Sequence, residues 1–250
     1  MYGGELNCPI TIRLIIGRGW GQGPTHSQNL QSWFAHIPGL KVVMPTFPSD
    51  AKELLEEAIQ DPNPVIFLEH RWLHNTEDPP EMHFENRISI GESRICKNGS
   101  DFTVITSGLL TLEAMKAASH LKEKYKILIE VIDLISIKPI DYKTIQSSVM
   151  KTKNLLVVDS GYSSCSIASE IISYITERNF SDLNSAPLKL AMPDCPEPTS
   201  FGLTNGFHIR ASNIAKKILD ALKIDSTRIY EEIPDPELHD VPGNWFVGPF

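Results

Sequence analysis

The sequence predicts an α/β protein with mainly parallel sheets, and two observations support this. Short apolar runs rich in β-branched residues alternate along the chain with segments in which apolar residues recur at helical spacing. This alternation is typical of parallel strands joined by crossover helices, which cover both faces of a sheet. One polar stretch, residues 76–92, interrupts the alternation and divides it into a short first part and a longer second part.

The first part contains signals for three strands and two helices. Ser49 is expected to be the N-cap of the second helix, because a serine side chain can accept a hydrogen bond from an N–H of the first turn. Pro38 and Gly39 separate the first helix from the strand that follows it. The expected strands are residues 10–16, 41–44 and 65–69, and the expected helices are residues 30–36 and 50–60.

The second part contains enough strands and helices for a complete doubly wound domain. The expected strands are residues 102–106, 127–134, 155–159 and 188–192, and the expected helices are residues 110–124, 142–151, 166–178 and 209–222.

The interruption at residues 76–92 is acidic, contains two consecutive prolines, and is longer than most connections inside a compact domain. We therefore expect a first unit at residues 1–75, a linker, a second unit at residues 93–223 and an extended tail at residues 224–250. Three parallel strands alone would leave an unpaired edge and an uncovered face. We expect a partner chain, or an N-terminal portion that this sequence lacks, to cover them.

The composition excludes several classes of protein. A formal net charge of -8 argues against non-specific nucleic-acid binding, which relies on Lys and Arg. No apolar run approaches the roughly 18 residues of a membrane span, and the N-terminus has no signal-peptide pattern. The cysteines are far apart and read as reduced thiols of a cytoplasmic protein. They are Cys8, Cys96, Cys165 and Cys195.

A glycine-rich loop followed by a single histidine, His26, is the strongest functional signal. The loop does not match the dinucleotide fingerprint: that motif needs glycines at offsets of two and five, and offset five from Gly17 is Gln22. A strand, a loop, a histidine and a helix in this order place the histidine at the carboxyl end of a sheet, where it can move protons near neutral pH. From spacing alone, His26 is either such a residue or a histidine bonded to its own loop without a chemical role.

The segment Ala-Ile-Gln-Asp-Pro-Asn-Pro at residues 58–64 is a candidate cation site. A helix that ends near Gln60 leaves its last carbonyl groups without intrahelical partners, and these carry negative partial charge. Pro62 and Pro64 prevent the helix from continuing and hold the turn rigid, which could fix the oxygens around a cation. The alternative is an ordinary helix end with water on its carbonyl groups.

Several motifs, in this order, resemble the beta subunit of thiamine-diphosphate-dependent 2-oxo acid dehydrogenases, which include the pyruvate and branched-chain enzymes. The resemblance covers about residues 1–223. It rests on Pro-Ile-Thr-Ile-Arg at 9–13, the glycine-rich loop with His-Ser-Gln at 26–28, Pro-Gly-Leu-Lys-Val-Val at 38–43, Ala-Lys-Glu-Leu-Leu at 51–55 and the segment 58–69. Val-Ile-Asp-Leu-Ile-Ser-Ile-Lys-Pro-Ile-Asp at 131–141 and Pro-Asp-Cys-Pro-Glu-Pro-Thr at 193–199 resemble the transketolase-type C-terminal domain of the same subunit.

This resemblance implies an α/β chain made of a partial pyrimidine-binding, transketolase-like domain and a complete transketolase C-terminal-type doubly wound domain. It implies that His26 is catalytic in the oxidative decarboxylation of a 2-oxo acid and in acyl transfer to lipoyl. The implied cofactor is thiamine diphosphate, with magnesium held mainly by an alpha subunit. The family's glutamate that bonds the aminopyrimidine ring would lie upstream of Met1, so no cofactor-binding residue is assigned here and the chain alone is expected to be inactive.

The resemblance also implies a structural potassium ion at the candidate cation site. Its implied partners are an alpha subunit, a second beta subunit and a lipoyl acyltransferase core. Two other interpretations stay open: a transketolase-like subunit that transfers sugar units, and a non-catalytic truncated module that serves assembly. Aromatic residues of the tail, Trp245, Phe246 and Phe250, are expected to dock on this subunit or its neighbour. The implied potassium ligands are Ile10, Ala58, Ile59, Asp61 and Asn63, mostly through backbone oxygens.

Overall fold

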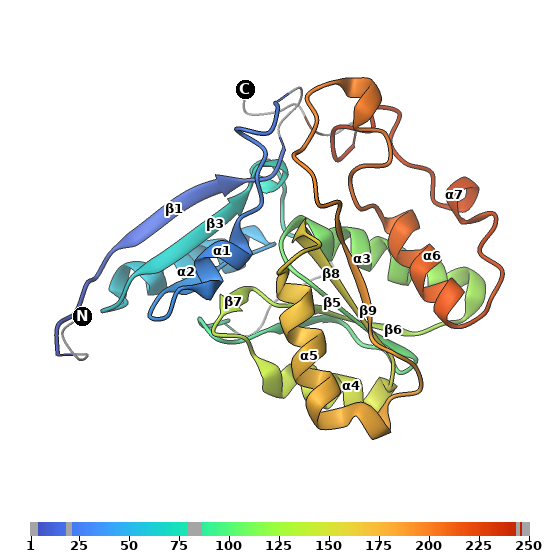
Figure 1. Cartoon of the computed structure of the whole chain (residues 1–250), viewed down its shortest axis with the longest axis horizontal. Helices are drawn as coiled ribbons and strands as arrows, with labels where there is room; N and C mark the ends of the chain where they lie inside the picture. Colours follow the sequence, from blue (N-terminus) through green and yellow to red (C-terminus); the bar gives the residue numbers. More distant parts are fainter. Residues whose placement is uncertain (1–4, 19–21, 80–86, 244–245, 247–250) are drawn as a thin grey trace.

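The computed structural model describes residues 5–18, 22–79, 87–243 and 246. In this part of the chain two sheets lie side by side, with helices packed on them, and the α/β class predicted from the sequence is confirmed (Figure 1). Among the described residues, no helix combines the length and the apolar character needed to cross a membrane.

The first sheet has four strands in the order β1-β3-β2-β7. Strands β1 (Thr11–Ile16), β3 (Val65–His70) and β2 (Lys41–Val43) are parallel, as the sequence predicts. The expectation of a three-stranded sheet is wrong, because β7 (Ser136–Lys138) from the second half of the chain pairs antiparallel with β2. The second half therefore covers one edge of the first sheet, while no described strand pairs with the outer edge of β1.

Two helices follow the strands of the first sheet. Helix α1 (Gln31–His36) lies after the glycine-rich loop, and α2 (Pro48–Gln60) follows β2. The expected N-cap Ser49 is wrong: Phe47 takes that place without a side-chain cap among the described contacts, and Pro48 begins the helix. Proline suits the first helical position, because its fixed φ is helical and its missing N–H would have no partner there.

The second sheet has five strands in the order β4-β6-β5-β8-β9. Four of them are parallel, and the fifth, β4, joins the edge antiparallel and is not among the strands that the sequence predicts. The strands are β4 (Arg94–Lys97), β5 (Phe102–Thr106), β6 (Ile129–Asp133), β8 (Leu155–Tyr162) and β9 (Leu188–Met192).

Helices cover both faces of the second sheet. The buried residues of α3 and α6 share one apolar cluster with the sheet, and those of α4 and α5 share another on the opposite face (Figure 1). The helices are α3 (Leu109–His120), α4 (Tyr142–Thr152), α5 (Ile167–Asn179), α6 (Ala211–Ala221) and the short α7 (Ile229–Glu232). Single turns lie at η1 (Arg71–Leu73), η2 (Leu121–Tyr125, a π-helical turn that continues α3), η3 (Phe180–Asp182) and η4 (Phe201–Leu203).

One apolar core joins the two sheets. Val42 and Leu68 of the first sheet belong to the same buried cluster as Ile105 and Val157 of the second sheet. Each fully buried side chain of this kind contributes about 1.5–3 kcal/mol. The two sheets therefore stabilise each other through a continuous core rather than through a thin surface contact.

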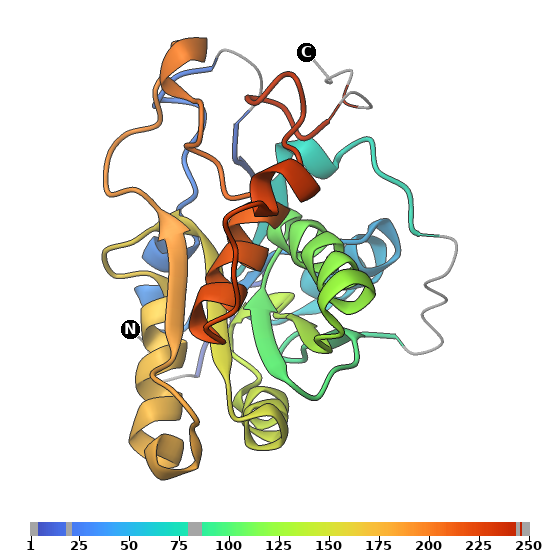
Figure 2. The same cartoon turned by 90° about the vertical axis from the view of Figure 1, so that its right-hand side faces the viewer.

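Three segments that are far apart in the sequence meet at one end of the molecule. Figure 2 shows the loop after β1, the loop after β9 and the C-terminal tail together there, above the carboxyl ends of the parallel strands. The tail is docked, as the sequence predicts: Phe246 lies edge-on to Trp72, with 6.4 Å between ring centroids. Trp245 and Phe250 lie outside the described residues.

Candidate functional site

The structure places His26 on the loop between β1 and α1, at the carboxyl end of β1. Its imidazole is exposed, and its backbone N–H donates to the carbonyl oxygen of Gly23 at 3.1 Å. The base of the loop is closed because the N–H of Gly17 donates to the carbonyl of Gln28 at 3.3 Å. The loop therefore presents His26 to solvent from a closed backbone frame; Gly19 and Gly21 lie outside the described residues.

Gly17 is a position that only glycine fits. Its φ is +76, and a Cβ atom there would overlap the imidazole ring of His70. This close approach joins the start of the loop to the end of β3. The ring of His70 is itself fixed, because its Nδ1 accepts a hydrogen bond of 3.2 Å from the backbone N–H of Trp72.

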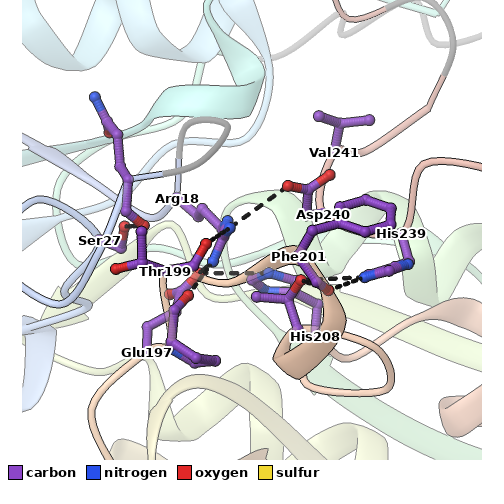
Figure 3. A network of polar contacts seen from close by, with 12 residues as sticks. Arg18, Ser27, Glu197, Thr199, Phe201, His208, His239, Asp240 and Val241 are labelled. Atoms are coloured by element: carbon purple, nitrogen blue, oxygen red, sulfur yellow. Dashed lines mark hydrogen bonds and ion pairs between the residues drawn. The ribbon is translucent and has the colours of Figure 1, made fainter.

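Arg18 leaves this loop and enters the interior between the two units (Figure 3). Its side chain is 0% exposed. One Nη donates to the carbonyl oxygen of Pro198 at 2.5 Å, and the other lies 3.4 Å from the carbonyl oxygen of Thr199. The same guanidinium lies 3.4 Å from a carboxylate oxygen of Glu197 and 3.5 Å from one of Asp240. A single buried side chain thus links the β1 loop, the loop after β9 and the tail.

Glu197 is an acid held in the interior. It is 3% exposed, and burial raises its pKa to about 7, although the guanidinium of Arg18 acts in the opposite direction. Desolvation outweighs the ion pair here, because the charged form of a buried carboxyl loses its hydration. Near neutral pH, the carboxyl group of Glu197 is therefore partly protonated, although it lies in the interior.

Two buried imidazoles contact Trp72, and one of them, that of His208, also lies close to this acid. Burial lowers the pKa of His70 and of His208 to about 3, and nearby cationic groups lower it further, so both rings are neutral at pH 7. The Nε2 of His208 lies 3.4 Å from Glu197, and its ring meets Trp72 edge-on at 5.2 Å. Because His208 is neutral, this contact joins an imidazole to a carboxyl group and is not an ion pair.

Arg210 completes the junction from the other side. Its guanidinium lies 5.2 Å from the centre of the Trp72 ring, and it donates to the carbonyl oxygens of His239 and Val241 at 2.8 and 2.7 Å. These bonds fix the tail onto the start of α6. His239 in turn contacts the carbonyl oxygen of Phe201 through its Nε2 at 2.6 Å.

A second buried acid lies between the sheets, away from the His26 loop. Burial raises the pKa of Asp133 to about 7, while hydrogen bonds from Thr46 and from the N–H of Ile135 oppose the shift. The neighbouring ion pair of Asp50 with Arg94, at 2.5 Å, ties α2 to β4. These groups hold the two sheets together and are remote from the exposed imidazole.

The structure gathers the residues of the predicted potassium site at the C-terminal end of α2, but protein groups already engage several of their oxygens. The carbonyl of Ala58 accepts from the hydroxyl of Thr11 at 2.9 Å and from the N–H of Asp61 at 3.3 Å. The carbonyl of Ile10 accepts from the N–H of Val65 at 2.9 Å. Lys41 supplies a positive charge here, because its ammonium group pairs with the carboxylate of Asp61.

The other two predicted ligands lie at the surface of the same helix end. The side chain of Ile59 is 64% exposed. The backbone N–H of Asn63 donates to a carboxylate oxygen of Asp61 at 2.8 Å. Within the described residues, no group of three or more His, Cys, Asp or Glu side chains is arranged to hold a metal ion.

Sequence reasoning missed the residues that surround the His26 loop. Arg18 and Glu197 are 179 positions apart, and no periodicity connects them. The motif at residues 193–199 drew attention to the segment, but only the fold shows that it touches the loop. All four cysteines lie in the described part of the chain, and each is a free thiol, as predicted.

Comparison with known proteins decides the family. The pyrimidine-binding domain of transketolase matches residues 1–76, and the C-terminal domain of transketolase matches residues 91–214. The chain belongs to the transketolase family. The two matches follow each other in the order that the sequence motifs predicted.

The curated relatives of this transketolase-family chain are beta subunits. It is 37% identical to the "Acetoin:2,6-dichlorophenolindophenol oxidoreductase subunit beta" of Cupriavidus necator, over 89% of this chain and 65% of the relative. It is 38% identical to the "Pyruvate dehydrogenase E1 component subunit beta" of Rhizobium meliloti, over 89% of this chain and 47% of the relative. The chain thus spans about half to two thirds of the length of these relatives.

Solved structures agree on the fold. A "split gene transketolase, inactive beta4 tetramer" is similar with a TM-score of 0.71 and 20% identity, over 87% of this chain and 68% of that one. The transketolase of Campylobacter jejuni is similar with a TM-score of 0.59 and 17% identity, over 84% of this chain and 31% of that one. At these identities the likeness concerns the fold alone.

Proposed function

We propose that this chain acts within the beta subunit of a thiamine-diphosphate-dependent 2-oxo acid dehydrogenase. The proposed activity is the oxidative decarboxylation of a 2-oxo acid, with transfer of the acyl group to lipoyl. The observation that carries the proposal is His26, an exposed imidazole at the carboxyl end of β1, in a chain whose relatives are named as beta subunits of pyruvate and acetoin enzymes.

The proposed role of His26 is to handle a proton at the reacting carbonyl oxygen. An imidazole can donate a hydrogen bond to oxygen as negative charge develops there, or return a proton during acyl transfer. Exposure on a loop with a closed base suits this role, because the substrate reaches the ring while the backbone stays in place. When bound, thiamine diphosphate supplies the electron sink for decarboxylation.

The described residues do not fit thiamine diphosphate on their own. Activation of its pyrimidine ring needs a free carboxyl group, and Glu69 of β3 is engaged by Arg13 at 2.5 Å and lies 3.5 Å from His74. The proposal therefore includes further polypeptide: the half of the pyrimidine-binding domain that this sequence does not contain, and an alpha subunit that holds the diphosphate through magnesium. A second beta subunit and a lipoyl acyltransferase core complete the proposed assembly.

The outer edge of β1 supports the need for additional protein. No described strand pairs with it, and the neighbouring side chains of Ile12 and Ile15 are 43% and 49% exposed. An unpaired strand edge with exposed apolar side chains beside it favours pairing with another strand. The proposed complementing segment would occupy this edge.

Reconstitution tests the proposal. The chain is co-expressed with the segment encoded next to it and with a matching alpha subunit, and decarboxylation of 2-oxo acids is followed through reduction of 2,6-dichlorophenolindophenol. We expect cofactor-dependent turnover that falls by about 100-fold in His26→Ala, the usual scale for a lost proton donor. A well-folded His26→Ala assembly with full activity would contradict the assignment of His26.

The same assembly distinguishes the alternatives. Transfer of two-carbon units between sugar phosphates, without turnover of 2-oxo acids, would identify a transketolase-like subunit. An assembly that forms but turns over neither class of substrate would identify a structural module.

A potassium ion at the end of α2 is also part of the proposal, with Ile10, Ala58, Ile59, Asp61 and Asn63 as its ligands. The negative partial charge of the helix end supports it. The hydrogen bonds on Ala58 and the ammonium group of Lys41 compete with it.

A further inference from the structure

Two described residues of the loop that carries His26 touch the second unit. Arg18 donates to the carbonyl oxygen of Pro198, and Gly23 contacts the side chain of Thr199. We propose that Arg18 and Gly23 together hold His26 in its working position, by fixing the β1 loop onto residues 197–199 of the second unit. Arg18 is thereby a positioning residue for His26.

The burial of Arg18 is the first support. An arginine that begins a surface loop normally leaves its guanidinium in water, because burial removes the hydration of a charge. Here the side chain is 0% exposed and directs its planar group at two consecutive carbonyl oxygens, those of Pro198 and Thr199. A planar guanidinium bonds two such acceptors from fixed directions. It therefore fixes the position of the Pro198–Thr199 backbone relative to Arg18 and does not merely balance charge.

The contact of Gly23 with Thr199 is the second support. A Cβ atom at Gly23 would overlap the hydroxyl oxygen of Thr199, so the backbone of Gly23 lies directly against the side chain of Thr199. The carbonyl of this same glycine accepts the N–H of His26 at 3.1 Å. Gly23 therefore connects the side chain of Thr199 to the backbone N–H of His26 through one packing contact and one hydrogen bond.

The charges around Arg18 fit a holding role. Glu197 and Asp240 face its guanidinium from the loop after β9 and from the tail (Figure 3), while the nearby imidazole of His208 is neutral. The cation therefore has one carboxyl partner in the second unit and one in the tail. Losing it would release the β1 loop from both segments at once.

The importance of His26 for activity rests on the proposed function, whereas its position can be measured on the full chain without any activity. Hydrogen exchange followed by mass spectrometry reads the amides of residues 22–28 directly. In Arg18→Met, which keeps an unbranched apolar stem and removes the guanidinium donors, we expect these amides to exchange about tenfold faster than in the unaltered chain. Peptides from β5 should exchange at the same rate in both proteins.

Arg210→Met is the matched control. Arg210 is a second arginine buried at the same junction, but its bonds go to the carbonyl oxygens of His239 and Val241 rather than to the loop. We expect this variant to loosen the tail and to leave residues 22–28 unchanged. Unchanged exchange of the loop in Arg18→Met, or equal acceleration in both variants, would overturn the positioning role.

A second pair of variants keeps the test decisive if Arg18→Met does not fold. In Gly23→Ala the new methyl group competes with the Thr199 hydroxyl, and the loop amides should exchange faster. Adding Thr199→Ala removes that hydroxyl and leaves a contact of 3.5 Å to the Cβ atom, so the double variant should return to the original rate. Exchange that stays fast in the double variant, or never rises in Gly23→Ala, would contradict the proposed contact.

The reconstituted enzyme adds an independent readout. If Arg18 only positions His26, Arg18→Met should lower kcat by about tenfold and leave KM for the 2-oxo acid within about twofold. Failure of reconstitution would count against the proposed function while the exchange result on the free chain still decides the positioning role.

Discussion

The buried acid and the buried imidazole at the junction should make stability depend on pH in opposite directions. Glu197 has a pKa of about 7 in the folded chain against an ordinary value of 4.5. Between these values the native state holds a proton that the unfolded chain has released. The stability that Glu197 contributes through this bound proton is therefore complete below pH 4.5 and is lost as pH rises through about 7.

The contribution of His208 to stability depends on pH in the opposite direction. Its pKa is about 3 in the folded chain against an ordinary value of 6.5, so between these values the unfolded chain holds the extra proton. The stability from the neutral ring is complete above pH 6.5 and is lost as pH falls toward 3. One pKa unit corresponds to about 1.4 kcal/mol, so between pH 7 and pH 5 each residue changes the free energy of unfolding by about 2 kcal/mol.

Glu197→Gln and His208→Gln separate these effects. The measured quantity is the free energy of unfolding at pH 5 minus that at pH 7, from urea unfolding curves. We expect this difference to fall by about 2 kcal/mol in Glu197→Gln and to rise by about 2 kcal/mol in His208→Gln. The double variant should return near the original value, because the two contributions cancel.

The control is Glu177→Gln, since the side chain of Glu177 is 68% exposed and its replacement should leave the pH dependence unchanged. Two single variants that shift the difference in the same direction, or that both leave it unchanged, would refute the argument from burial. In that case desolvation would not govern the protonation of Glu197 and His208.

Three further outcomes are expected. The purified chain should bind thiamine diphosphate with magnesium weakly or not at all in calorimetric titration, because Glu69 is engaged and the alpha subunit is missing; tight stoichiometric binding would contradict this. Potassium chloride should raise the Tm more than choline chloride at equal ionic strength if the end of α2 holds the ion, and equal Tm values would remove the potassium site from the proposal. Calorimetric unfolding should show one transition, because a single apolar core joins both sheets; two separate transitions would mean that the units fold independently.

The elements that sequence patterns predicted well are those with their own periodicity. Strand β5 has the predicted bounds, and α5 begins directly after Ser166, whose side chain accepts a hydrogen bond from the N–H of Ser169. The strands β4 and β7 are only four and three residues long. Each of them joins the antiparallel edge of a sheet, and the partner strand that it pairs with is not visible in its local sequence.

The residues of the candidate site also fall into those that the local sequence predicts and those that only the fold reveals. His26 was found from its local setting, since a strand, a glycine-rich loop and a helix are contiguous in sequence. The residues around the loop could not be found in this way, because they come from distant segments. For a buried charge such as Glu197, sequence alone predicts a solvated side chain, and only the fold shows that it is 3% exposed.

The same long-range contacts bear on how the loop that carries His26 is held in place. The first sheet has an open outer edge at β1 among the described residues, yet its other edge is closed by β7, and its apolar face shares a core with the second sheet. Both the short strand and most of that core come from residues beyond the linker. Arg18 adds a third connection at the loop itself. The placement of His26 therefore depends on the second unit, which supplies the support that three parallel strands alone would lack.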